Sequence, residues 1–199
     1  MSLRTWLSMC VCVGSLVGCG HPIRDLVHEV KDLVPDDEKE ASAPTCPGQA
    51  TTRIELIANL HAGSPATTWD PSRPEATSSF VVSGAPFTSD GRAVDVRIFF
   101  ASRGDDHWSW HVLANQRSAG QELGSGQLHF DGEGALIEAN VTAPLRLPLP
   151  DGSLSAPISV GVGSAKSADQ DGFGGVTSTD EPSRLDSYEQ DGLGNGSCS

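Results

Sequence analysis

The sequence has few basic residues. Lysine and arginine together number 13 against 26 aspartates and glutamates, which gives a formal net charge of -13 at pH 7. A polyanion repels nucleic acid, and no basic stripe offsets the acidic excess. The composition therefore excludes nucleic acid as a partner and is of the kind that keeps an exported protein soluble.

The motifs of well-known catalytic machineries are also missing. The chain has no G-x-S-x-G elbow, no S-x-x-K pair, no H-E-x-x-H and no glycine-rich phosphate loop followed by lysine. We therefore expect a protein that is not an enzyme and has no cofactor. The acids Asp105 and Asp106 leave a cell-wall-acting enzyme as an alternative, but neighbours on a strand point to opposite faces, which disfavours joint acid–base work.

No apolar run is long enough to span a membrane comfortably. The N-terminal run, residues 6–17, follows the positive charge of Arg4 and has the form of a secretory signal. It ends in LVGC at 16–19, which resembles the lipobox of bacterial lipoproteins. The resemblance implies cleavage before Cys19, diacylglycerol on its thiol and an acyl chain such as palmitate on the new amino terminus. Residues 1–18 would then be the signal peptide.

The expected localisation is the cell envelope, where the lipid would hold the protein on a membrane. Several acyl chains give stable anchoring, whereas one chain binds only marginally. Gly20 follows the cysteine where, in enteric-type bacteria, an aspartate would favour the inner membrane, so we expect the outer membrane. An ordinary signal with a chance cysteine, or an uncleaved anchor, is the alternative.

Residues 19–48 are expected to form a tether. Apolar residues in 22–34 recur at spacings of three, four and seven, which predicts a short amphipathic helix. Pro22 suits its first position and Pro35 ends it. The charged stretch 35–45 is typical of a linker that holds a domain off the membrane. The apolar stripe could rest on lipid or dock on the domain.

From Thr51 onward the hydrophobic residues recur with a period of two, which is typical of strands with one buried face. Turns that contain Asp-Gly or Gly-Asp lie between these expected strands. Eight short strands are predicted, at 51–60, 78–83, 93–101, 107–115, 127–130, 135–141, 143–149 and 157–163. The pattern predicts for residues 49–199 an all-β domain, an antiparallel meander closed as a sandwich or a β-barrel, with Trp108 and Trp110 in its core.

The alternation stops after Gly163. Residues 169–199 carry seven acids against one arginine, and we expect turns and loops there that cover one end of the domain. The oxygen-rich groups near glycines are Asp169 with Asp171, and Asp186 with Glu189 and Asp191. Calcium is an alternative for them, but neither group completes the EF-hand pattern, which favours plain turns.

His107 and His111, beside two aspartates, are the best candidates for metal ligands. On a helix this spacing would point both rings at one ion. On a strand four residues span about 13 Å, so the two rings would share a face but no metal. We expect both histidines to face solvent, opposite the tryptophans, and we predict no metal.

Cys46 and Cys198 bracket the β region. In an oxidising compartment two such cysteines are natural partners. We predict a disulfide between them, for which the chain-entropy model gives about 5 kcal/mol. Two separate thiols are the alternative.

Segments of the β region occur in the order of a known family. They are TTRIELIANLHA at 51–62, WDPSRPEATSSF at 69–80, the stretch at 81–114, SGQLHFDGEGALI at 125–137 and SRLDSYEQDGLGNG at 183–196. Together they resemble the second domain of the bacterial flagellar hook protein, the FlaE-like domain, over about three quarters of the chain. The resemblance implies a compact β-barrel-like domain on the outside of the hook tube, without catalytic residues.

The chain departs from hook proteins at both ends, where a lipobox and an early stop replace the helical segments that polymerise in the tube. We therefore expect a lipid-anchored, non-enzymatic protein whose domain is structural or binds an envelope protein. A component or accessory of the flagellar hook or basal body is the alternative.

Overall fold

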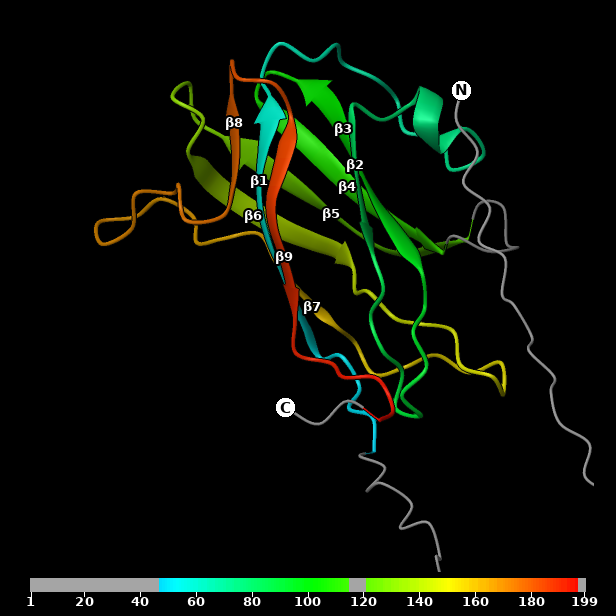
Figure 1. Ribbon diagram of the computed structural model, residues 1–199. Helices are drawn as coiled ribbons and strands as arrows, with labels where there is room; N and C mark the ends of the chain where they lie inside the picture. The colour runs from blue at the N-terminus through cyan, green and yellow to red at the C-terminus, as the bar shows by residue number, and fades with distance from the viewer. Residues whose placement is uncertain (1–46, 115–120, 197–199) are drawn as a thin grey trace, which may run out of the picture. The chain divides into compact units, whose positions relative to one another are not determined.

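The protein folds into two β-sheets (Figure 1). The computed structural model describes residues 47–114 and 121–196. The predicted signal peptide, Cys19, the amphipathic helix and nearly all of the linker lie outside these residues, as do Cys46 and Cys198. Within the described ranges, no helix has the length and apolar character needed to cross a membrane. The strands are β1 (Arg53–His61), β2 (Phe80–Gly84), β3 (Val96–Gly104), β4 (His107–Ala114), β5 (Glu122–Phe130), β6 (Leu136–Ala143), β7 (Ser159–Gly161), β8 (Val176–Thr179) and β9 (Arg184–Gln190).

The larger sheet is an antiparallel meander in the order β2-β3-β4-β5-β6. Its strands alternate between a buried and an outward face, because apolar and polar residues alternate in the sequence. The hairpin between β3 and β4 turns at Asp105 and Asp106, which have φ of 52° and 60°. Positive φ at both central residues is the signature of a type I′ turn, whose twist matches that of the flanking strands.

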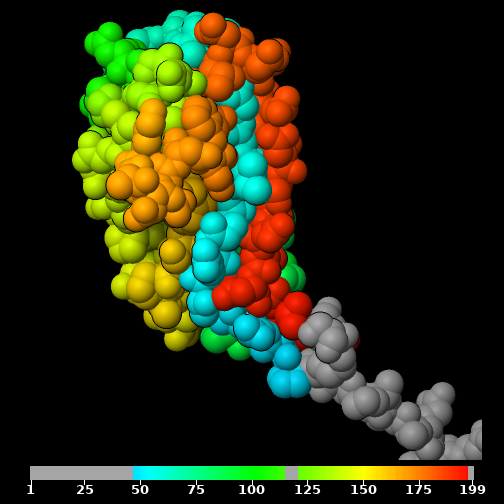
Figure 2. Space-filling model, turned by 90° about the vertical axis from the view of Figure 1, so that its left-hand side faces the viewer, coloured from blue at the N-terminus to red at the C-terminus, as the bar shows by residue number. Residues whose placement is uncertain are grey.

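The smaller sheet is built around β1. One edge of β1 pairs antiparallel with β9, and the other pairs in parallel first with β7 and then with β8. Figure 2 shows β1 and β9 running side by side along one face, with the β7–β8 loop against the strands of the larger sheet. Backbone hydrogen bonds from Leu136 and Lys166 join that loop to β6.

The all-β prediction is confirmed, and residues 47–114 and 121–196 contain nine strands where about eight were expected. The sequence left a sandwich and a barrel as alternatives. The described residues form two separate sheets, and no ladder among them closes a barrel. The meander is as expected in the larger sheet, whereas the parallel pairs of β1 were not anticipated.

Two local predictions are wrong. Residues 169–199 were expected to be loops, yet β8 and β9 lie there; β9 keeps most of its side chains exposed, so no alternation marks it. A strand was expected at 143–149, but Ala143 is the end of β6, and residues 144–149 form only the isolated bridges Leu145–Ile158 and Pro148–Leu154. Proline lacks the N–H that a ladder needs, which explains the interruption.

The hydrophobic core lies between the two sheets. Trp108 and Trp110 are both 2% exposed within it, which confirms their predicted position. They belong to the same buried cluster as inward side chains of β1, such as Leu56 and Leu60. Gly126 on β5 has to be glycine because a Cβ there would collide with the Trp110 indole.

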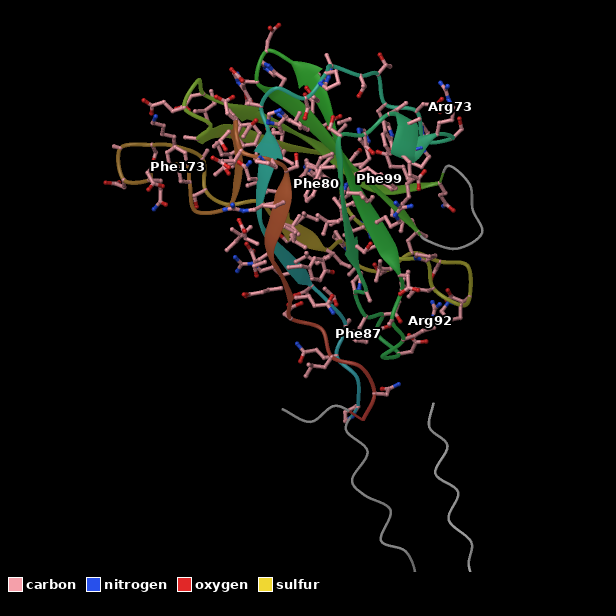
Figure 3. The ribbon with its side chains drawn as sticks, turned by 45° about the horizontal axis from the view of Figure 1, so that its top comes forward. Arg73, Phe80, Phe87, Arg92, Phe99 and Phe173 are labelled. Atoms are coloured by element: carbon pink, nitrogen blue, oxygen red, sulfur yellow. The ribbon has the colours of Figure 1, made fainter. Side chains whose placement is uncertain are left out.

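A second aromatic contact lies outside this core, on the outward face of the larger sheet. Phe99 is 1% exposed although its neighbours Ile98 and Phe100 are the residues that point into the core. Figure 3 shows Phe80 toward the interior and Phe99 nearer the short 3-10 helix η1 (Pro74–Ala76), which covers this face.

Candidate functional site

The connection between β1 and β2, residues 62–79, crosses the outward face of the larger sheet; we call it the crossing segment. The Thr67 amide donates to the Ser102 carbonyl (2.8 Å) and the Ser79 amide to the Phe100 carbonyl (2.8 Å). Arg97 on β3 forms an ion pair with Glu75 in η1, and this contact lowers the pKa of the Glu75 carboxyl. The segment is therefore fixed to the sheet at several points.

Trp69 is the centre of this contact. Its ring stacks on His111 of β4, with centroids 4.3 Å apart and planes 8° apart, and lies 5.5 Å from the Phe99 ring. The Glu122 carboxylate holds both stacked rings: Trp69 Nε1 donates to Oε2 (3.3 Å), and His111 Nδ1 lies 3.2 Å from Oε1. One carboxylate thus sets the orientation of the pair.

The His111 ring has one nitrogen without a partner. An ionised carboxylate only accepts hydrogen bonds, so Nδ1 carries the proton and Nε2 presents a lone pair. Nε2 is buried and has no hydrogen-bond partner among the described residues. Burial lowers the pKa of His111, and the hydrogen bond to Glu122 opposes this only in part. Burial therefore favours the neutral form of the ring.

A hollow of about 520 Å³ opens beside this stack. Its walls come from the crossing segment, the end of β3, and strands β4, β5 and β6. Besides Trp69 and His111, the polar residues around it include Arg103, Ser125, Gln127 and Thr142. Within the described part of the chain, these four side chains make no hydrogen bond or ion pair with one another or with other residues.

His107 and His111 share the outward face of β4 but have separate surroundings. The His107 ring stacks on His129, with centroids 3.8 Å apart, whereas His111 lies under Trp69. The expectation that both face solvent holds for His107 and is wrong for His111, because the crossing segment covers it. The described residues contain no group of three or more metal-ligating side chains.

The other acidic candidates have local roles. Asp105 and Asp106 form the turn of the β3–β4 hairpin. Asp171 accepts a hydrogen bond from the Phe173 amide (2.9 Å), and Asp186 pairs with Arg184 (2.9 Å). Asp169 and Glu189 remain exposed.

Asp191 joins the end of β9 to the start of β1. Its Oδ1 accepts hydrogen bonds from the amides of Thr52 (2.8 Å) and Arg53 (3.0 Å), and its Oδ2 accepts one from the Thr52 hydroxyl. The Thr52 hydroxyl contributes most to a lowered pKa of the Asp191 carboxyl. The hydrogen bonds make this carboxylate a clamp between two strands.

Sequence reasoning missed the Trp69, Glu122 and Arg103 side chains as members of one site. The signal present in the sequence was a lone tryptophan within a polar, proline-containing connection, WDPSRPEATSSF. Such a residue has to find apolar surface somewhere, but the sequence does not say where the connection crosses the sheet.

A family of known proteins matches more than half of the chain. Residues 57–193 match the family described as flagellar basal body protein FlaE D2 domain, and the chain belongs to that family. Membership indicates a structural, flagellum-related role. No curated protein matches the chain.

Among solved structures, the chain is similar to the 32 kDa fragment of the flagellar hook protein FlgE from Caulobacter crescentus. The two are 15% identical, with a TM-score of 0.45 over 62% of this chain and 52% of that one. The chain thus spans about half the length of that fragment.

Proposed function

We propose that the protein is a membrane-anchored lipoprotein whose D2-type domain makes structural, non-enzymatic contacts with another protein of the cell envelope. The observation that carries the structural role is the family match over residues 57–193. The observation that carries the anchor is the LVGC sequence at 16–19 after an apolar run.

The fold suits a tethered module. Gly48 N donates to Asn195 Oδ1 (2.7 Å), so the first and last described residues meet at one end of the domain. From there β1 runs to the opposite end, where the crossing segment begins and the β3–β4 hairpin lies (Figure 1). The chain therefore enters the domain at the end opposite the crossing segment and the β3–β4 hairpin.

A second candidate is an accessory or component of the flagellar hook or basal body. The family match favours it, because this family's domains are found in flagellar proteins. In both candidate functions the domain binds another protein. The two differ in whether that partner belongs to the flagellum.

The anchor is tested by exchanging residues 1–18 for an ordinary cleavable signal and replacing Cys19→Ser. We expect wild type in the membrane fraction and this variant in the soluble periplasmic fraction, with the same circular dichroism spectrum. Cys12→Ser is the control, since it lies inside the signal and leaves Cys19 in place. A Cys19→Ser protein that still sediments with membranes contradicts the proposal.

A further inference from the structure

The hollow beside Trp69 is not explained by the packing of the two sheets. It lies on the outward face of the larger sheet, away from the core between them. Its volume, about 520 Å³, is within the range of about 300–1,000 Å³ that is typical of ligand sites. The hollow therefore has room for a small molecule.

The groups around it lack partners. Most buried polar atoms in proteins are hydrogen-bonded, so an exception calls for a physical reason. His111 Nε2 is such an exception among the described residues, and Ser125 is 6% exposed with no hydrogen bond from its hydroxyl within the same residues. Nε2 itself is closed to a ligand, whereas the Arg103, Ser125 and Gln127 side chains line the hollow.

The kinds of side chain limit the chemistry of that ligand. Arg103 donates hydrogen bonds, and Ser125, Gln127 and Thr142 both donate and accept them. Among the described residues no carboxylate lines the hollow, which disfavours a hard metal ion. Arg103 is the one cation among these lining residues, in a chain of net charge -13, which disfavours an anion.

A ligand meets these conditions if its hydroxyl groups both donate and accept hydrogen bonds and its ring has an apolar face. Trp69 supplies the aromatic surface on which such a face packs. We propose that this hollow binds a short neutral oligosaccharide, with Trp69 against a sugar ring and Arg103 and Gln127 hydrogen-bonded to its hydroxyls. The site is independent of the proposed anchor and protein contacts, so either can fail without the other.

The test uses the full chain, purified in a detergent without a sugar head group. Chitotriose, cellotriose and maltotriose are titrated separately, and binding is followed by calorimetry and by tryptophan fluorescence. Trp69 lines the hollow whereas Trp108 and Trp110 are buried, so a fluorescence change at saturation would report on the site. We expect saturable binding of at least one trisaccharide, with a Kd at or below about 1 mM.

Two variants locate the binding. Gln127→Ala and Arg103→Ala each remove a side chain that has no hydrogen bond within the described residues, so both should keep the wild-type melting temperature. Each is expected to weaken binding about tenfold, the loss of roughly one good hydrogen bond. Gln170→Ala is the matched control, because Gln170 is an exposed glutamine outside this hollow.

Saturable binding that Gln127→Ala and Arg103→Ala weaken and Gln170→Ala does not would support the site. Absence of saturable binding by all three sugars up to ~10 mM, well above the expected range, would overturn it. Binding that neither variant weakens would overturn it as well, since the sugar would then sit elsewhere.

Discussion

At the scale of single residues, the turn between β3 and β4 places two L-residues in the left-handed region. Asp105 and Asp106 have φ of 52° and 60°, a region that costs non-glycine residues energy because Cβ approaches the carbonyl oxygen. The Gly-Asp pair in RGDD at 103–106 predicted a turn here. Gly104 has a φ of 83°, and the two aspartates share that conformation.

Replacing Asp106→Gly should stabilise the protein. The change gives the turn an Asp-Gly pair, which type I′ turns favour, and should raise the free energy of unfolding by about 0.5–1 kcal/mol. Urea denaturation measures the difference. Asp95→Gly is the matched control, since Asp95 is exposed and has an ordinary φ, and it should be neutral or destabilising. A loss of stability in Asp106→Gly would contradict this account of the turn.

His111 links stability to pH. Burial lowers its pKa in the folded protein below the ordinary value of 6.5, so the folded state favours the neutral ring. The unfolded chain therefore binds more protons as the pH falls below about 6.5, and stability decreases toward the folded pKa. The contribution of this ring is fully present above about pH 6.5 and lost on acidification.

A His111→Gln variant should flatten that dependence. Urea midpoints measured between about pH 7 and about pH 5 are expected to fall less steeply in the variant than in wild type. His107→Gln is the comparison, because its ring lies on the exposed part of the same strand face. If the urea midpoint depends on pH equally steeply in wild type and in His111→Gln, the His111 ring is not the source of the pH dependence.

At the scale of secondary-structure elements, the sequence predicted the strands that have one buried face. In β3, Val96, Ile98 and Phe100 alternate with outward residues, and the period of two marks them directly. It did not reveal β9, whose residues are mostly exposed and polar. That strand is held by long-range pairing with β1, which leaves no local pattern in the sequence.

The covered position of His111 escaped prediction for a related reason. Alternation along β4 shows which face His111 occupies, opposite Trp108 and Trp110. It carries no information about the crossing segment, which returns over that face from another part of the chain. The fold class could therefore be predicted from local periodicity, whereas the hollow depends on contacts between distant segments.

The Asp191 clamp should matter for the pairing of β9 with β1. Asp191→Ala removes three hydrogen bonds to a charged acceptor near the surface and should lower the free energy of unfolding by about 1–2 kcal/mol. Asp186→Ala on the same strand removes only an exposed ion pair and should have an effect near zero. Chemical denaturation of both variants checks this, and equal effects would contradict the clamp.

At the scale of the whole molecule, the two ends of the domain meet. Gln49 and Leu193 exchange backbone hydrogen bonds of 2.8 and 2.9 Å, next to the contact of Gly48 with Asn195. Each further residue spans at most about 3.5 Å. Cys46 precedes Gly48 by two residues and Cys198 follows Asn195 by three, so a bridge between them is compatible with the described fold.

We therefore predict a Cys46–Cys198 disulfide in the exported protein. Reduction should add the mass of two hydrogens and lower the free energy of unfolding by about 2–5 kcal/mol. Intact mass spectrometry and denaturation with and without reductant measure both effects. Two thiols that are alkylated in the native, unreduced protein would contradict the prediction.

We propose that a D2-type domain on a lipid tether contacts an envelope protein, and the family of that domain points first to the flagellum. The most direct test is to purify hook–basal bodies from the host and to probe them, beside a flagella-free membrane fraction, for this protein. The account predicts a lipidated protein in membranes, with enrichment in the hook–basal-body fraction if the partner is flagellar. A protein found only in soluble fractions, in neither membranes nor hook–basal bodies, would contradict it.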